Sequence, residues 1–89
     1  MPDYFSSIVG LLAAALTSLS YIPQLQKAWP RGATEDISLK MLVVLCLGLA
    51  LWIVYGLIRS DWVVAVANTA GLSLVVAVLA CKIRDLRAG

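Results

Sequence analysis

The fold is decided by residues 37–83, ISLKMLVVLCLGLALWIVYGLIRSDWVVAVANTAGLSLVVAVLACKI. This stretch contains two long apolar runs, about residues 37–58 and 62–83, which are separated only by Arg59, Ser60 and Asp61. Each run is close to the ~20 residues that a helix rising 1.5 Å per residue needs to cross a ~30 Å hydrocarbon core. A connection this short makes the two helices antiparallel neighbours. We therefore predict a transmembrane helical hairpin.

A third apolar run, about residues 5–25, precedes the hairpin and is joined to it by the polar segment 29–36, with Ser38 suited to begin the second helix. The chain is 62% hydrophobic and only 13% charged, far from the usage of soluble domains. The first run is too long for a signal-peptide core and no Lys or Arg precedes it, so we expect it to be retained. The fold class predicted is an all-α membrane protein in which residues 1–89 form a single three-helix domain.

The basic residues predict the orientation of the chain. Arg59 is alone on the side of the N-terminus and the second loop, whereas the other side carries Lys27, Arg31, Lys40, Lys82, Arg84 and Arg87. Cytoplasmic flanks are enriched in Lys and Arg, so we predict the N-terminus outside and the C-terminus in the cytoplasm. Three helices cannot enclose an aqueous path alone, so we expect a parallel homodimer of six helices. A net charge of +2 that arises at helix ends gives no support for nucleic-acid binding.

The two cysteines, Cys46 and Cys81, lie in apolar runs with no second sulfur or His nearby. We interpret both as buried small hydrophobic residues. Because the sequence contains no set of metal ligands and no nucleophile and base arrangement, we expect no metal, no cofactor and no enzymatic activity.

The first helix carries a polar face formed by Thr17, Ser20, Tyr21 and Gln24. We favour a wall that faces water, although Thr and Ser hydroxyls in membranes also bond to their own backbone or hold helices together. Pro23 removes a backbone hydrogen bond to Leu19 and predicts a kink. That kink is either a static bend or a hinge for the inner part of the helix.

Trp52 and Asn68 are the sharpest signal in the sequence. Each lies six residues inside the outer end of its helix, so the two side chains are expected at nearly the same depth, ~9 Å inside at 1.5 Å per residue. An indole face stacks on the C–H faces of a sugar ring, and a carboxamide both donates to and accepts from hydroxyls. The pair predicts a site for a small neutral sugar, with helix–helix contact by Asn68 as the alternative.

No Asp, Glu, His, Lys or Arg lies deep within any predicted span. Proton-coupled carriers usually need one, so we predict uncoupled, downhill transport. Arg59 and Asp61 at the outer mouth are interpreted either as a gate together with Tyr55 or as ordinary exposed loop charges.

These features resemble the bacterial SemiSWEET transporters, three-helix relatives of the SWEET sugar carriers in the PQ-loop superfamily. The resemblance covers nearly the whole chain and is carried by Tyr21-Ile22-Pro23-Gln24, Asp36-Ile37-Ser38, Trp52, Tyr55, Arg59, Asp61 and Asn68. It implies a parallel homodimer with helix three packed between helices one and two, and alternating access in both directions.

The same resemblance implies roles for individual residues. Trp52 and Asn68 would bind sugar at the dimer axis, with Thr17 and Ser20 as further candidates from the polar face. Tyr55, Arg59 and Asp61 would close the extracellular side. The motif that contains Tyr21, Pro23 and Gln24 would act as the hinge of the intracellular gate, and Met41 would form an inner constriction.

Three other functions remain open. A PQ-loop carrier of amino acids or a small multidrug antiporter would call for an acidic residue within the membrane, and a scaffold protein that only binds partner helices would show no saturable sugar flux. The sequence does not distinguish a monosaccharide such as glucose from a disaccharide such as sucrose.

Overall fold

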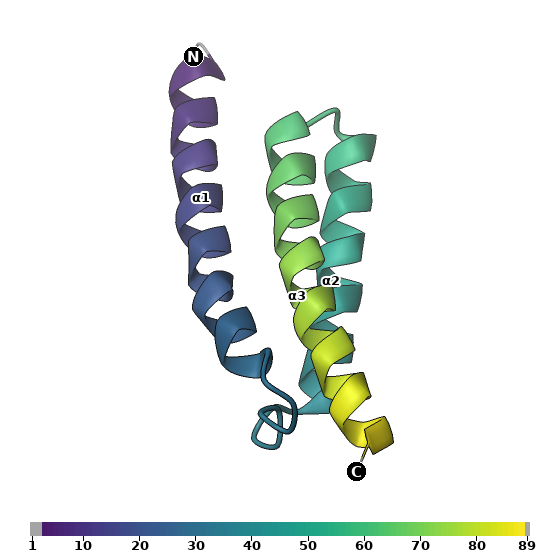
Figure 1. The fold of residues 1–89 in the computed structure, drawn as a ribbon. Coiled ribbons are helices and arrows are strands. Elements are labelled where there is room, and N and C mark those ends of the chain that lie inside the picture. Colours follow the sequence, from purple (N-terminus) through teal and green to yellow (C-terminus); the bar gives the residue numbers. More distant parts are fainter. Residues whose placement is uncertain (1–2, 89) are drawn as a thin grey trace.

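Three helices make up the computed structural model, which describes residues 3–88 (Figure 1). They are α1 (Asp3–Ala28), α2 (Leu39–Ile58) and α3 (Trp62–Ala88), and no strand occurs within the described residues. Each helix is long and apolar enough to cross a membrane. The prediction of an all-α, three-helix membrane protein is confirmed.

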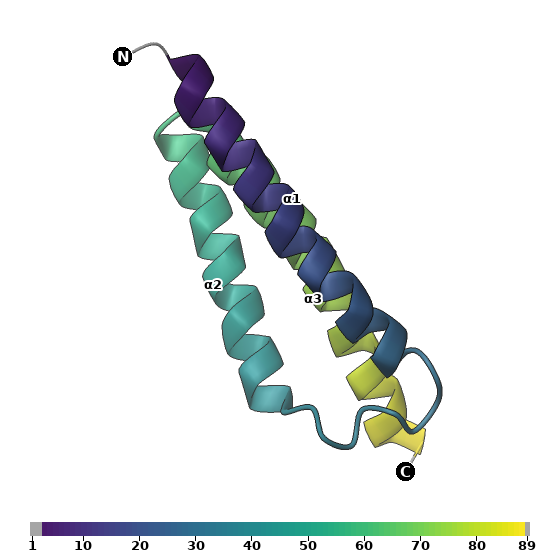
Figure 2. The same ribbon diagram turned by 90° about the vertical axis from the view of Figure 1, so that its left-hand side faces the viewer.

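The helix α3 contacts both of the others, whereas α1 and α2 share no contact within residues 3–88. The N-terminal end of α1 and the α2–α3 turn lie at one end of the molecule, and the α1–α2 loop lies near the last turns of α3 at the other (Figures 1 and 2). We call these the outer end and the inner end. The chain is elongated, 53 × 23 × 14 Å, so one copy spans the ~40–45 Å of a complete bilayer.

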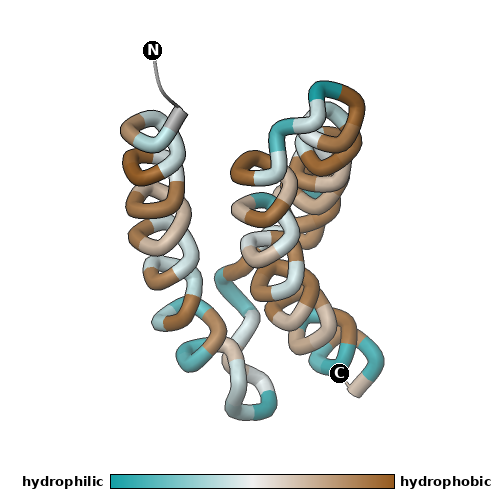
Figure 3. The backbone as a smooth tube through the Cα atoms, turned by 90° about the horizontal axis from the view of Figure 1, so that it is seen from above, coloured by the Kyte–Doolittle hydropathy of each residue, from teal (hydrophilic) through white to brown (hydrophobic). Residues whose placement is uncertain are grey.

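Most large apolar side chains of the single chain are exposed. Leu16, Leu51 and Ile58 expose 70%, 69% and 75% of their surface, far more than a soluble monomer presents in one region. Hydrophobic residues run along all three helices, whereas hydrophilic residues gather near the helix ends and loops (Figure 3). Such a surface is suited to lipid or to partner helices.

The buried core lies toward the inner half of the molecule, where Ala28, Leu42, Val75, Val78 and Cys81 pack together. Cys81 is 6% exposed, as predicted. Cys46 is only half-buried and packs at the edge of this cluster. The prediction that Cys46 is buried is wrong for the single chain, because this residue lies at the edge of the cluster rather than inside it.

The α2–α3 turn brings two backbones into contact. A Cβ atom at Gly56 would lie 2.8 Å from the Ala65 amide nitrogen, so only glycine lets the helices approach this closely. Ser60 has a φ of 53°, and the Asp61 amide donates to the Gly56 carbonyl at 2.8 Å. Ser60 thus has the left-handed backbone conformation that often ends a helix, and the amide after it donates a hydrogen bond to one of the last carbonyls of α2.

The helix boundaries differ slightly from the predicted ones. The Ser38 hydroxyl accepts from the Met41 amide at 3.1 Å and caps α2, so this helix begins at Leu39 rather than about residue 37. α1 continues through Pro23 to Ala28 and bends in its lower half (Figure 1). α3 continues past Ile83 to Ala88, because Arg84 and Asp85 have partners in the α1–α2 loop.

Candidate functional site

A cavity of about 260 Å³ lies between α1 and α3 at middle depth. Thr17, Tyr21 and Asn68 supply its polar groups, and its other lining residues are Gly10, Ala13, Ala14, Leu49, Val63, Val64, Ala67 and Gly71. Three of the predicted site residues therefore meet in one place. Because the remaining lining residues are small or aliphatic, the polar groups stand out in an apolar wall, which is the usual form of a small-molecule site.

Asn68 is held in place by its own helix. Its Nδ2 donates to the Val64 carbonyl at 2.8 Å, and the side chain is part-buried. Among the described residues, no group donates a hydrogen bond to its Oδ1. A carboxamide has two donors and an accepting oxygen, so Asn68 retains both donor and acceptor capacity toward a ligand.

Tyr21 lies beside Gly71 of α3 in this cavity. A Cβ atom at Gly71 would lie 3.4 Å from Cε2 of Tyr21, so the ring lies against the backbone of α3. Thr17 is one turn from Tyr21 on the same face of α1. Tyr21 was predicted on the polar face with Thr17 and, from the resemblance, in the hinge of the inner gate; it lines this cavity with Thr17 and Asn68.

Ser20 does not line this cavity. Its hydroxyl donates to the Thr17 carbonyl at 2.6 Å, which is the local backbone bond considered as an alternative above. The polar face of α1 is therefore divided: Thr17 and Tyr21 line the cavity beside α3, while the Ser20 hydroxyl is bonded to its own helix.

Trp52 and Tyr55 form an aromatic pair on α2. Their ring centroids lie 5.4 Å apart with an interplanar angle of 84°, an edge-to-face geometry that aromatic rings favour. The two side chains remain 54% and 50% exposed. Trp52 does not line the cavity that Asn68 lines. In a single chain the indole therefore stays half exposed and does not share a cavity with Asn68.

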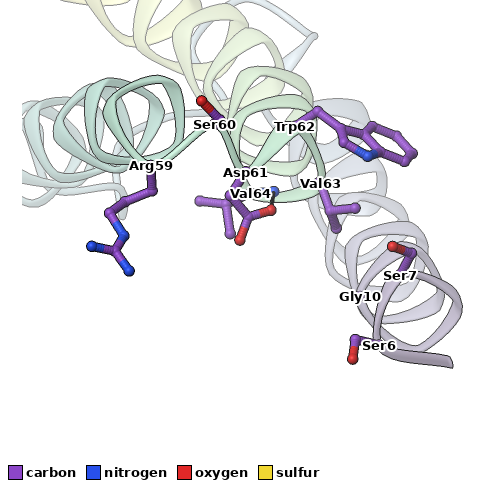
Figure 4. A pocket seen from close by; sticks show the side chains of 9 residues that line it. All are labelled: Ser6, Ser7, Gly10, Arg59, Ser60, Asp61, Trp62, Val63 and Val64. Atoms are coloured by element: carbon purple, nitrogen blue, oxygen red, sulfur yellow. Dashed lines mark hydrogen bonds between the residues drawn. The ribbon is translucent and has the colours of Figure 1, made fainter. Parts of the chain in front are cut away.

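At the outer end, a cavity of about 460 Å³ opens between the N-terminal turns of α1 and α3. Arg59, Asp61, Ser6, Ser7 and Trp62 contribute to its lining, and Figure 4 shows Arg59, Asp61 and Ser6 directed to the same side. Asp61 Oδ1 accepts from the Val64 amide at 3.2 Å and so caps α3. Arg59 and Asp61 are not paired within residues 3–88, where the one ion pair joins Arg84 and Asp85.

A third cavity, of about 270 Å³, lies at the inner end. Gln24 and Met41, two of the residues predicted for the intracellular gate, line it together with Lys27, Asp36 and Ser38. Pro23 precedes Gln24 in α1 and is exposed. The structure thus brings Gln24 of α1 and Met41 of α2 to one opening.

Sequence reasoning missed a polar cluster at the inner end that joins α3 to the α1–α2 loop. Asp85 accepts from the Thr34 hydroxyl at 2.7 Å, Arg84 donates to the Trp29 carbonyl at 2.7 Å, and Lys82 donates to the Thr34 carbonyl at 2.9 Å. From the sequence, Lys82 and Arg84 were interpreted only as basic residues that indicate the cytoplasmic side of the membrane. Their partners lie about fifty residues away, and no spacing rule identifies them.

No group of His, Cys, Asp and Glu that could hold a metal ion occurs in the described part of the chain. All three cavities instead present hydroxyl, amide or charged groups beside apolar walls. Such surfaces are suited to binding a polar organic molecule rather than a metal.

Comparisons with known proteins identify a matching family and similar proteins. Residues 5–65 match the PQ-loop repeat family. The chain is 36% identical over 84 residues to the sugar transporter SemiSWEET of Bradyrhizobium diazoefficiens, a match that covers 94% of this chain and 98% of the relative. It is 37% identical over 79 residues to the sugar transporter SemiSWEET of Leptospira biflexa, covering 89% and 93% of the two chains.

A solved crystal structure of a bacterial homologue of SWEET transporters has a similar fold. The two superpose with a TM-score of 0.85 at 31% sequence identity, and the match covers 91% of this chain and 98% of the other. The likeness therefore extends over nearly all of both chains.

Proposed function

The chain belongs to the PQ-loop family and, within it, to the SemiSWEET transporters, and from this premise we propose that it carries a mono- or disaccharide across the bacterial inner membrane. Transport is passive and bidirectional and proceeds by alternating access in a parallel homodimer, with the N-terminus outside and the C-terminus in the cytoplasm. A transport function agrees with the expectation that the chain is not an enzyme. Three apolar helices make it a multi-pass membrane protein.

The observation that carries this proposal is the uncharged polar cavity at middle depth. Asn68, Thr17 and Tyr21 line it, and no Asp, Glu, Lys or Arg does. Neutral donors and acceptors suit sugar hydroxyls, since each hydroxyl both donates and accepts. An ion at this depth would require a countercharge. The cavity therefore favours a neutral, hydroxyl-rich substrate.

The proposed dimer completes the site with Trp52. Its indole is 54% exposed in one chain, and it lies six residues from the end of α2, as Asn68 lies six residues from the start of α3. Two copies would present two indoles to the sugar, one from each chain. An indole that is open in the single chain supports a substrate or a partner subunit as its missing neighbour.

The absence of an Asp, Glu, Lys or Arg side chain from the lining of the central cavity supports uncoupled transport. Of the three cavities described above, Lys27 and Asp36 line the inner one, Arg59 and Asp61 line the outer one, and none of these four lines the central one. Charges at the two mouths suit gates that open to water. We assign the outer gate to Tyr55, Arg59 and Asp61, and the inner gate to Met41 and Gln24 with Pro23 as its hinge.

The test is counterflow in proteoliposomes of the purified chain preloaded with unlabelled glucose or sucrose. Radiolabelled sugar should accumulate transiently inside with one of these sugars and at the same rate with and without a pH gradient. A pH-dependent rate would indicate proton coupling, and counterflow of amino acids alone would favour the amino-acid carrier. No saturable flux of either class would favour the scaffold.

A further inference from the structure

We propose that Arg84 and Asp85 are positioning residues, which fasten the inner end of α1 and the loop after it to α3 so that these parts move as one body. We call Thr34, Lys82, Arg84 and Asp85 the loop clamp. The role of the clamp in the transport cycle rests on the proposed function. The clamp itself rests on the hydrogen bonds between α3 and the α1–α2 loop.

Asp85 holds the loop with both carboxylate oxygens. Oδ1 accepts from the Gly32 amide at 3.0 Å and from Arg84 Nε at 2.9 Å, and Oδ2 accepts from the Thr34 amide at 3.2 Å and the Thr34 hydroxyl at 2.7 Å. Hydrogen bonds to an ionised carboxylate are stronger than neutral ones. The side chain of Asp85 is only 12% exposed, so little water competes for these bonds.

Arg84 holds the end of α1. Its two terminal nitrogens donate to the carbonyls of Trp29 at 2.7 Å, Ala28 at 3.2 Å and Pro30 at 3.0 Å. The last carbonyls of a helix have no partner within the helix, and a cation there interacts favourably with the helix dipole. A side chain of α3 thus supplies the C-terminal cap of α1.

Thr34 is the member of the loop clamp that belongs to the α1–α2 loop. It is fully buried at 0% exposure, and Lys82 Nζ donates to its carbonyl at 2.9 Å. Gly32 has a φ of 82°, a conformation that glycine adopts readily and that turns its amide toward Asp85. If Asp85 were lost, the buried Thr34 hydroxyl and amide would lose their partner, which is costly.

The loop clamp holds only the part of α1 that follows Pro23. Arg84 reaches Ala28 only five residues after Pro23, and a proline removes the backbone hydrogen bond to the residue four positions earlier. The segment 24–28 is therefore held to α3 through Ala28, and the helix that joins it to the outer part of α1 lacks one backbone hydrogen bond at Pro23. Figure 2 shows the loop passing across the inner end of α3 on its way to α2.

This arrangement determines the shape of the inner opening. Gln24 and Lys27 belong to the clamped segment and line the inner cavity together with Met41 of α2. With the clamp closed, α3 sets the position of Gln24 relative to Met41. Bending at Pro23 then moves the outer part of α1 against a fixed inner body, rather than swinging a free helix end.

The first test measures hydrogen exchange of the segment 29–36 in the full chain reconstituted in lipid. Asp85→Asn should speed exchange of this segment at least about tenfold, because an amide nitrogen replaces one of the two accepting oxygens and places a donor against the Gly32 or the Thr34 amide. Glu35→Gln is the matched control, since Glu35 is an exposed acid of the same loop without a hydrogen bond among those described. Unchanged exchange in Asp85→Asn would overturn the clamp.

The second test asks whether the clamp positions α1. Ala28→Cys places a thiol at a site that is 0% exposed, and a membrane-impermeant maleimide applied from the inner side should label it slowly. Adding Asp85→Asn or Arg84→Gln should speed labelling at least about fivefold, whereas Arg87→Gln should not. The parent chain with its native cysteines gives the background. Equal labelling rates would show that the α1 end stays in place without the clamp.

The third readout is transport per folded dimer. Asp85→Asn should change the counterflow rate at least about threefold while leaving the equilibrium dissociation constant for sugar within about twofold, since the clamp touches no substrate. Thr34→Val, which removes only a hydroxyl, should act in the same direction with a smaller effect and serves if Asp85→Asn does not fold. An unchanged counterflow rate together with faster exchange and labelling would overturn the positioning role.

These readouts separate the two proposals. If the parent chain catalyses no counterflow of sugar, the proposed function fails, while exchange and thiol labelling still decide whether the clamp holds α1 to α3. If counterflow is robust but the clamp variants behave like the parent in all readouts, the clamp fails and the sugar carrier stands.

Discussion

The two ends of the molecule use their charged side chains in opposite ways. At the inner end, Arg84 and Asp85 are bonded to each other and to the α1–α2 loop of the same chain. At the outer end, Arg59 and Asp61 line an open cavity of about 460 Å³ and form no ion pair within residues 3–88. Arg84 and Asp85 thus have their partners within one chain, whereas Arg59 and Asp61 face an open cavity that a partner subunit, a substrate or water could fill.

This contrast separates residues that stabilise the fold from residues that we assign to transport. Changes to Arg84 or Asp85 should lower stability and alter transport only through position. Changes to Arg59 should affect transport with little cost in stability. The predictions below test this separation, beginning with the largest expected effect.

Trp52→Ala and Asn68→Ala should each reduce counterflow to the level of protein-free liposomes, because each removes a group that we expect to contact the sugar. The measurement is initial uptake rate in proteoliposomes, with dimer content followed by crosslinking. Trp29→Ala is the control, since this side chain is 66% exposed at the inner end and should be dispensable. Loss of the dimer in either site variant would instead support a role in helix contact.

Gly56→Ala should destabilise the chain by about 1–3 kcal/mol, since the new methyl group overpacks a backbone contact. The contact is that of Gly56 with Ala65, where the added Cβ would lie 2.8 Å from a backbone nitrogen. Reversible unfolding in mixed micelles provides the measurement.

Gly48→Ala in the same helix is the matched control. A Cβ at Gly48 meets nothing within 4 Å, so this change should be neutral or stabilising by up to ~1 kcal/mol. Equal effects of the two substitutions would show that the close approach of α2 and α3 is not needed.

The two helix caps offer a pair of variants, one at each end. Ser38→Ala and Asp61→Ala each remove a side-chain acceptor, at 3.1 Å from Met41 N and 3.2 Å from Val64 N, and each should cost about 1 kcal/mol of unfolding free energy. Only Asp61→Ala should also change the uptake rate, because Asp61 belongs to the assigned outer gate. A transport defect of equal size in both would remove the distinction between the two ends.

Arg59→Gln should have the smallest effect on stability. We expect a change of less than ~0.5 kcal/mol in unfolding free energy, as for an exposed charge without a fixed partner. A larger loss, measured by the same unfolding assay, would mean that Arg59 forms a strong contact in the folded dimer. Arg84→Gln, measured in parallel, should lower the unfolding midpoint clearly more.

The existence of the three helices could be predicted from sequence, because three long apolar runs allow few structures in a bilayer. Ser38 was recognisable as the start of α2 from its residue type and position. The extension of α3 to Ala88 was not, because Arg84 and Asp85 look like ordinary polar residues beyond a span until their loop partners are known.

The candidate site was predictable in part. Periodicity placed Thr17 and Tyr21 on one face of α1, and both line the cavity with Asn68. It could not reveal that Ser20 bonds to its own backbone, since the choice between a local and an external partner depends on the neighbouring helix. The meeting of Trp52 and Asn68 around a sugar remains a prediction, because Trp52 is open to a neighbour that one chain does not contain.

An odd number of helices leaves the two chain termini at opposite ends of the molecule (Figure 1). Two copies that share one orientation therefore cannot be joined into a single polypeptide by a short linker. The join must itself cross the bilayer, which takes about 20 further apolar residues in a helix. Any single-chain version of a parallel pair would thus contain seven membrane crossings rather than six, with the extra one serving only to return the chain to its starting side.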